Sequence, residues 1–222
     1  MRSLAFVVAA VVPLVSMTAS LRAQTTVPLS GEAKHHLVFE NSHTRVYDVV
    51  VPAGDSTLYH VHANDYVYVT LGKASLEAQG LGAAQTKLDL ADGEVRYTKG
   101  PITHRVLNPS NTAFHNLTIE VLEPAGVTLA PASPGDVALE NDRVRAVRIV
   151  LAPGQRTPRH DHRGPWLEVA VKPGTVSVDD GTGPPRRETL APAKYAWHAA
   201  GTSHLITNVG NSRVELVEID WK

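Results

Sequence analysis

Two short stretches hold the residues best suited to chemistry. Residues 54–62 read GDSTLYHVH and residues 154–162 read GQRTPRHDH, so each has a glycine, five further residues and two histidines separated by one residue. A third histidine follows each stretch at the same distance, His104 after the first and His204 after the second. Histidine is the commonest metal-ligand side chain, and a pair needs another ligand to close a shell around an ion. The two trios predict two metal sites.

The elements that must position these trios read as strands. Segments rich in β-branched and aromatic residues lie at 46–51, 66–71, 117–122, 144–151, 167–172 and 214–219, and turn sequences such as PAGD, NPSN and APGQ lie between them. Alternate side chains of a strand share a face, so His60 and His62 should point the same way, as should His160 and His162. The pattern predicts an all-β fold built of sandwich or barrel domains.

An offset of one hundred residues relates the two halves of the chain. It pairs the three histidines of one trio with those of the other, and it also pairs Gly54 with Gly154 and Asn108 with Asn208. A repeat of this length predicts two copies of a small domain, because solenoid units are much shorter. We expect an N-terminal domain at 30–123, a linker rich in proline and glycine at 124–136, and a C-terminal domain at 137–222.

Residues 1–23 have the order of a secretory signal, in which Arg2 precedes an apolar run and then a more polar segment ending at Ala23. The run is short and interrupted, which favours a cleaved signal over a membrane anchor. We therefore expect a periplasmic or secreted protein with no membrane span after signal removal. Cysteine is absent, so no disulfide framework forms, and 21 basic against 22 acidic residues give no basis for binding nucleic acid.

The spacing of these residues resembles the two sequence motifs of the cupin superfamily, and the chain looks like a two-domain cupin, or bicupin. The resemblance rests on Gly54, His60, His62, Asp65, Gly72, Gly93, His104 and Asn108 in the first copy, and on Gly154, His160, His162, Glu168, Gly174, Gly201, His204 and Asn208 in the second. It implies two tandem jelly-roll β-barrels and, by analogy, a homodimer. It also implies one divalent transition metal ion per competent domain, with iron, manganese, nickel, copper and zinc all open.

The resemblance further implies that three histidines and one carboxylate hold each ion. In the first copy these are His60, His62, Asp65 and His104, and in the second His160, His162, Glu168 and His204. Both carboxylates depart from the motif spacing, since only two residues separate Asp65 from His62 and five separate Glu168 from His162. We favour the second copy as the main site, because its carboxylate is a glutamate.

Three functions stay open on these residues. The first is an exported, metal-dependent, dioxygenase-like oxidoreductase that acts on a small organic molecule such as a flavonol or a dione. Resemblance to bicupin dioxygenases such as quercetinases implies that Glu168 is then also the catalytic base. The second is a periplasmic protein that binds a small molecule or a metal without chemistry. The third is a metal-dependent isomerase or lyase, which oxygen consumption would distinguish from the first.

Overall fold

A computed structural model describes residues 25–132 and 134–222. The segment expected to be a signal, residues 1–23, lies outside this part of the chain. Within the described residues, no helix is long and apolar enough to cross a membrane.

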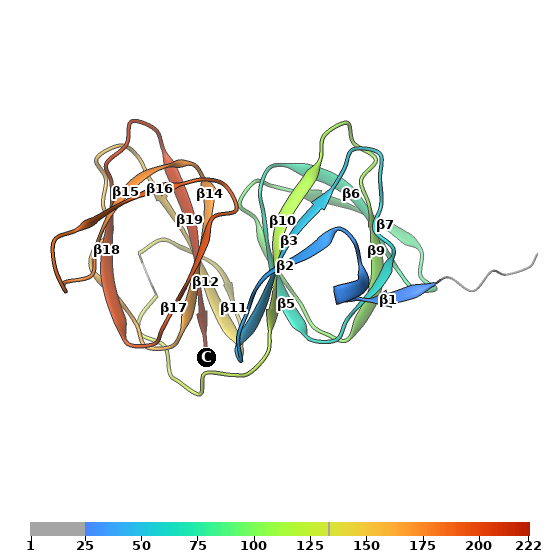
Figure 1. The fold of residues 1–222 in the computed structure, drawn as a ribbon, viewed down its shortest axis with the longest axis horizontal. Helices are drawn as coiled ribbons and strands as arrows, with labels where there is room; N and C mark the ends of the chain where they lie inside the picture. The colour runs from blue at the N-terminus through green and yellow to red at the C-terminus, as the bar shows by residue number, and fades with distance from the viewer. Residues whose placement is uncertain (1–24, 133) are drawn as a thin grey trace, which may run out of the picture.

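The chain folds into two β-barrels that lie side by side (Figure 1). We call residues 26–121 the N-terminal barrel and residues 136–221 the C-terminal barrel. The first contains β1 (Thr26–Pro28), the 3₁₀ helix η1 (Leu29–Gly31), β2 (His35–Glu40), β3 (Thr44–Val51), β4 (Tyr59–His62), β5 (Asp65–Thr70), β6 (Ala74–Gly80), β7 (Gln85–Leu90), β8 (Val95–Thr98), β9 (Ile102–Leu107) and β10 (Phe114–Val121). The second contains β11 (Asp136–Glu140), β12 (Val144–Leu151), β13 (His160–His162), β14 (Trp166–Lys172), β15 (Gly174–Asp179), β16 (Arg186–Leu190), β17 (Tyr195–His198), β18 (Thr202–Asn208) and β19 (Val214–Trp221).

Corresponding strands occupy corresponding places in the two barrels. The N-terminal barrel has sheets ordered β2-β3-β10-β5-β8 and β1-β4-β9-β6-β7, and the C-terminal barrel has sheets ordered β11-β12-β19-β14-β17 and β13-β18-β15-β16. The N-terminal barrel has one addition, since β1 pairs in parallel with β4 and places Val27 beside His60. The expected all-β class with two tandem barrels is confirmed.

The central strands of one sheet in each barrel are buried on both faces. On β10 and β19, one face carries Leu117, Ile119, Val217 and Ile219, which belong to a hydrophobic core that both barrels share. The opposite faces line the two barrel interiors, where Phe114 and Leu216 belong to two separate clusters. Because both faces of these strands pack against other parts of the protein, they carry few exposed residues, and every residue of β19 is buried.

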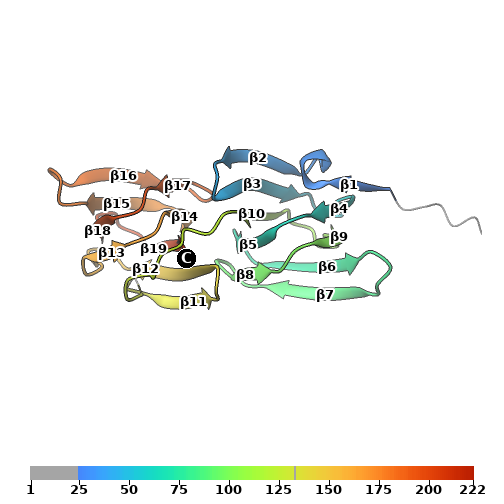
Figure 2. The ribbon, with the colours of Figure 1, turned by 90° about the horizontal axis from the view of Figure 1, so that it is seen from below.

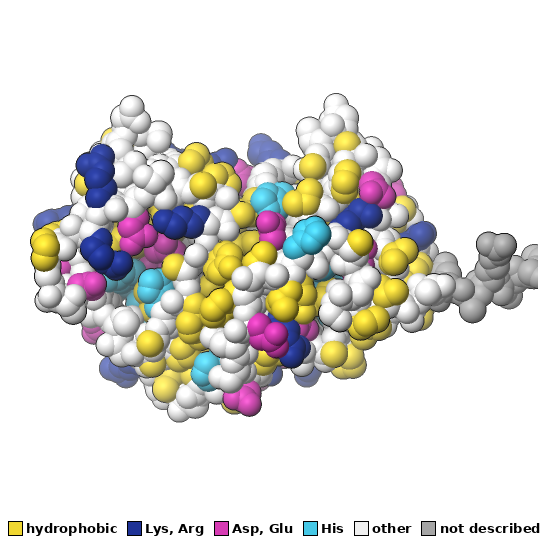
Figure 3. Space-filling model, in the orientation of Figure 1, with side chains coloured by type: hydrophobic (Ala, Val, Ile, Leu, Met, Phe, Trp, Pro, Cys, Tyr) yellow, Lys and Arg dark blue, Asp and Glu magenta, His cyan; other side chains and the backbone are white. Residues whose placement is uncertain are grey.

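Hydrogen bonds between the barrels surround this shared core. Tyr195 donates to the carbonyl of Val38 at 2.8 Å, and the Trp221 indole donates to the carbonyl of His43 at 3.1 Å. Figure 2 shows the sheets of both barrels in one continuous stack, and Figure 3 shows hydrophobic side chains gathering where the barrels meet. The two halves therefore form one packed unit.

Candidate metal centres

The strands bring the three histidines of each trio together by their register. His60 on β4 lies opposite His104 on β9, and His160 on β13 lies opposite His204 on β18. His62 and His162 lie two residues along the same strands, so they share a face with their partners. The sequence predicts that a distant third histidine joins each pair, and the structure brings these three histidines together in each barrel.

Turns at the barrel end hold these strands in place. Gly54 and Gly154 adopt positive φ angles of 72° and 77°, which glycine reaches without steric cost, and each donates its N–H to the carbonyl of Asn108 or Asn208 at 2.9 Å. The Asn208 amide in turn donates to the carbonyls of Leu151 and Ser212, both at 2.8 Å. The glycine and asparagine of the repeated pattern thus connect the turn that precedes each histidine pair with the strand that carries the third histidine.

In the C-terminal barrel, four side chains direct their ligand atoms at one point. They are His160, His162, His204 and Glu218, all buried, with ligand atoms within 4.8 Å of one another. The Nε2 atoms of His160 and His204 lie 2.8 Å apart, and those of His162 and His204 lie 3.3 Å apart. A Glu218 oxygen lies 3.2 Å from His160 Nε2, and the other lies 3.3 Å from His204 Nε2.

The outer nitrogens of these rings are already bonded to the protein. His160 Nδ1 donates to the carbonyl of Pro158 at 3.1 Å, and His162 Nδ1 donates to Asp220 at 2.6 Å. Such bonds favour the tautomer in which the lone pairs of His160 and His162 are on Nε2, toward the other ligands, when an ion is bound. Burial opposes ionisation of Glu218, but its close contacts with the His160 and His204 rings lower its pKa, so the carboxylate is ionised.

This donor set fits a divalent transition metal ion. Ligands held about 2.1 Å from one ion are roughly 3.0–3.4 Å apart. Five of the separations between ligand atoms here, 2.8 to 3.6 Å, bracket that range, and all the ligand atoms lie within 4.8 Å of one another. Three imidazoles and one carboxylate suit iron, copper, nickel or zinc, and the carboxylate also admits manganese.

Glu168, the carboxylate that the sequence suggested as a ligand, lies outside this group. It pairs in register with Glu218 on the neighbouring strand and lines a cavity of about 300 Å³, together with His204, His198 and Trp166. Burial, followed by the negative charges of Glu218 and Glu188, raises the pKa of Glu168 to about 7. The structure therefore places Glu218 where the sequence pattern suggested Glu168, and it leaves Glu168 beside the site as a group able to exchange a proton near neutral pH.

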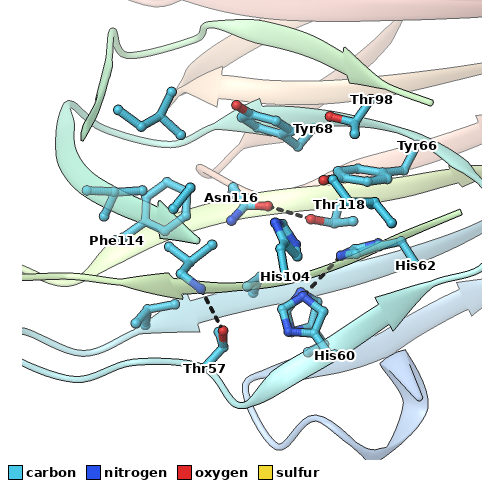
Figure 4. A pocket seen from close by; sticks show the side chains of 18 of the residues that line it. Thr57, His60, His62, Tyr66, Tyr68, Thr98, His104, Phe114, Asn116 and Thr118 are labelled. Atoms are coloured by element: carbon cyan, nitrogen blue, oxygen red, sulfur yellow. Dashed lines mark hydrogen bonds between the residues drawn. The ribbon is translucent and has the colours of Figure 1, made fainter. Parts of the chain in front are cut away.

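The N-terminal barrel gathers histidines without a carboxylate. Nε2 of His60 lies 3.1 Å from Nε2 of His62, and the rings of His60 and His104 have centroids 4.7 Å apart. Figure 4 shows these three rings at one side of a cavity, with Phe114 at the other. Burial is the main reason that the pKa falls to about 4 for His60, about 2 for His62 and about 3 for His104, so all three are neutral and keep a lone pair for a metal.

The cavity beside these histidines has a volume of about 190 Å³ and mostly apolar walls. Leu76, Leu90 and Phe114 line it, and Tyr66 and Tyr68 also face it. The structure therefore offers an apolar chamber in the N-terminal barrel and a charged one in the C-terminal barrel.

Asp65, the second carboxylate suggested by the sequence, is bonded elsewhere. Its oxygens accept hydrogen bonds from the Tyr97 hydroxyl and, at 2.9 Å, from the Gly100 N–H, and Arg143 of the other barrel lies 3.4 Å away. Burial opposes ionisation of Asp65, but these partners lower its pKa. Asp65 thus joins the two barrels, and the structure does not bring it to His60 and His62.

Comparisons with known proteins bear on the fold. No family model and no curated protein matches the sequence. AerE from Microcystis aeruginosa has a similar structure, with a TM-score of 0.59 and 11% identity over 86% of this chain and 98% of that one. Oxalate decarboxylase from Bacillus subtilis gives a TM-score of 0.58 and 11% identity over 81% of this chain and 68% of that one. The chain has a double cupin fold.

A single cupin domain from Bordetella pertussis Tohama I matches 44% of this chain at 22% identity, with a TM-score of 0.38.

In both barrels of this chain, the site residues that the sequence did not reveal come from strands without histidine motifs. Glu218 and Asp220 lie on the last strand, and His35 lies on β2. Carboxylates at alternate positions of an otherwise apolar terminal strand were the signal for Glu218 and Asp220, because such groups need a partner when they are buried.

Proposed function

We propose that this protein is a metal-dependent enzyme of the dioxygenase type that acts on a small organic molecule in the C-terminal barrel. The observation that carries the proposal is the set of four convergent ligands with a further carboxylate, Glu168, which lines a cavity that one of the ligands, His204, also lines. A protein that only stored a metal would need the four ligands but not this additional acid. Export to the periplasm or beyond is part of the proposal and rests on residues 1–23.

The chain supplies three functions around the cavity. His160, His162, His204 and Glu218 would hold the ion, and Asp220 orients the His162 ring through its Nδ1. The ion, once bound, would supply Lewis acidity toward a substrate oxygen and redox chemistry with dioxygen. Glu168 takes the proton that an enolisable substrate loses, because a carboxyl group with a pKa of about 7 can both accept and release a proton near neutral pH.

The charges of the residues that line the cavity limit which substrates it can bind. Among its described lining residues, Glu168, Asp180 and Glu188 are acidic and Arg186 is the one cation. Arg186 already lies 3.7 Å from Asp180 and 3.5 Å from Glu188. An anionic substrate would meet repulsion there, so a neutral hydroxylated or dicarbonyl compound fits the cavity better.

The test joins metal analysis to oxygen uptake. The full chain, reconstituted separately with iron, copper, nickel and manganese, is assayed in an oxygen electrode with a flavonol and with acetylacetone. Glu218→Gln should lose the metal of the C-terminal barrel and all turnover, while Glu168→Gln should keep the metal and lose at least a hundredfold in rate. Asp161→Asn, which changes an exposed carboxylate between two ligands, is the matched control. A folded chain that binds no metal in the C-terminal barrel would refute the proposal.

A second candidate is a metal-dependent isomerase or lyase. It is favoured by His198, which lines the same cavity as Glu168 and stacks on Trp166 with ring centroids 3.9 Å apart. Two proton-carrying groups at one cavity suit a reaction that moves a proton without oxidation. Product formation under argon, with no oxygen consumed, would select this candidate.

A further inference from the structure

A fourth histidine of the N-terminal barrel points into the site. His35 lies on β2, in the sheet that faces the β4 and β9 histidines, and its ring centroid lies 4.6 Å from that of His60 and 5.9 Å from that of His62. His35, His60 and His62 each offer a ligand atom within 4.8 Å of the other two. The His35 side chain is only 5% exposed. A buried imidazole so close to two others needs a reason.

Glu32 supplies the first argument that His35 is a ligand. This carboxylate accepts a hydrogen bond from Nδ1 of His35 at 2.9 Å and further bonds from the N–H groups of Lys34 and Leu58. Its side chain is 1% exposed. A carboxylate that holds the outer nitrogen of an imidazole is the usual support of a metal-binding histidine, because it turns the other nitrogen toward the ion. Nε2 of His35 is the nitrogen left free.

The other two rings supply the second argument. Nδ1 of His60 donates to the carbonyl of Leu58 at 2.9 Å, so the lone pair of neutral His60 is on Nε2, which faces Nε2 of His62 at 3.1 Å. Two ring nitrogens at this separation can share at most one hydrogen, and an ion between the rings would use the lone pairs of both Nε2 atoms.

The third argument is a difference between the barrels. The position that corresponds to Glu218 is Thr118, which donates to the side chain of Asn116 at 2.8 Å and brings no charge. The position that corresponds to His35 is Gly135, where any side chain would collide with the backbone carbonyl of Arg148. Each barrel therefore has one possible metal ligand that the other lacks. The C-terminal barrel has a carboxylate on β19, and the N-terminal barrel has an imidazole on β2.

We propose that the N-terminal barrel holds a second ion in a histidine-only site made of His35, His60 and His62, with His104 beside them. This goes beyond the function proposed for the C-terminal barrel. A site made of imidazoles suits copper, nickel, zinc or iron, whereas manganese prefers oxygen ligands. The N-terminal site therefore selects imidazole-preferring ions, and the C-terminal site, with Glu218, accepts manganese as well.

The experiment titrates the metal-free full chain with Zn²⁺ and, separately, with Mn²⁺ by calorimetry. Two sites are expected for Zn²⁺ and one for Mn²⁺. His35→Ala should lower the Zn²⁺ affinity of one site at least tenfold, and Glu32→Gln should lower it 10- to 100-fold, while the other site is unchanged. His36→Ala removes the exposed neighbouring histidine on the same strand and should change neither site.

A spectroscopic readout separates a ligand from a structural residue. With Cu²⁺ bound to a His160→Ala/His162→Ala chain, the nitrogen couplings in the electron paramagnetic resonance spectrum should change in His35→Ala and stay the same in His36→Ala. A His35→Ala chain with wild-type zinc affinities and an unchanged copper spectrum would overturn the proposal. An unfolded His35→Ala chain is recognised by loss of the C-terminal site as well, and Glu32→Gln then decides the question.

Discussion

Asp220 shows how much a metal site depends on residues that never touch the ion. It accepts the Nδ1 hydrogen of His162 at 2.6 Å, and both side chains are buried. Without this bond the ring could turn or change tautomer, and the Nε2 lone pair would no longer point at the other three ligands.

Asp220→Asn should therefore weaken metal binding in the C-terminal barrel by a factor of 10 to 100. The amide keeps the shape of the side chain but lacks the negative charge that strengthens the bond to His162. Competition against a chromogenic chelator measures the change, with Asp161→Asn as the control on the same histidine strand. Equal affinity in Asp220→Asn and the wild type would mean that the ring is held by packing against Trp166 instead.

At the level of elements, β10 and β19 carry the chemical difference between the barrels. Thr118 and Glu218 lie at matching places, since Thr118 pairs with Tyr68 of β5 and Glu218 pairs with Glu168 of β14. Both side chains are buried and belong to the faces that line the barrel interiors.

Thr118→Glu should give the N-terminal barrel a carboxylate ligand and, with it, affinity for Mn²⁺. The cavity next to Thr118 provides room for the longer side chain. In a His160→Ala/His162→Ala chain, titration of free Mn²⁺ by paramagnetic resonance should show one bound ion in Thr118→Glu and none in the parent. Thr86→Glu, on the exposed face of β7, controls for added charge. A folded Thr118→Glu chain that binds no Mn²⁺ would show that β10 does not direct this position at the histidines.

The strands were predictable, but the carboxylates were not. The β-branched segments predict an all-β chain, and pleating places His160 and His162 on one face of a strand. The distant His204 was predictable because the repeat gives each histidine pair a third histidine at the same offset. Glu215 and Glu218 are both glutamates of β19, yet Glu215 pairs with Arg148 and Glu218 joins the histidines. Which face of β19 looks inward depends on packing between barrels, and that does not appear in the local pattern. The signal, the domain limits and the dimer stay predictions.

At the level of the whole molecule, the shared core predicts that the two barrels unfold as one cooperative unit. Leu117 of β10 is fully buried in that core together with Leu167, Val217 and Trp221 of the C-terminal barrel. All three tryptophans, Trp166, Trp197 and Trp221, lie in the C-terminal barrel, so their fluorescence reports on that barrel and, through Trp197 and Trp221, on its contact with the N-terminal barrel.

Leu117→Ala should lower the free energy of unfolding by about 2–5 kcal/mol, because it leaves a cavity in the shared core. The change is in the N-terminal barrel, yet we expect the tryptophan fluorescence and the circular dichroism to report the same lowered urea midpoint. Leu81→Ala, at an exposed position of the same barrel, should leave the midpoint unchanged. Two separate transitions, with the fluorescence midpoint unmoved, would show that the barrels unfold independently.

The face-to-face packing of matching sheets has a consequence for symmetry. Two identical barrels joined through this face would form a twofold dimer, in which every substitution appears in both subunits and both sites must stay alike. Here residues 122–135 connect two barrels in one chain, so each position occurs once and each site can change alone. Thr118 at the position that corresponds to Glu218, and Gly135 at the position that corresponds to His35, are such single changes. The covalent link keeps the two barrels together at any dilution and would let one molecule hold two different metal ions, as proposed for the two sites.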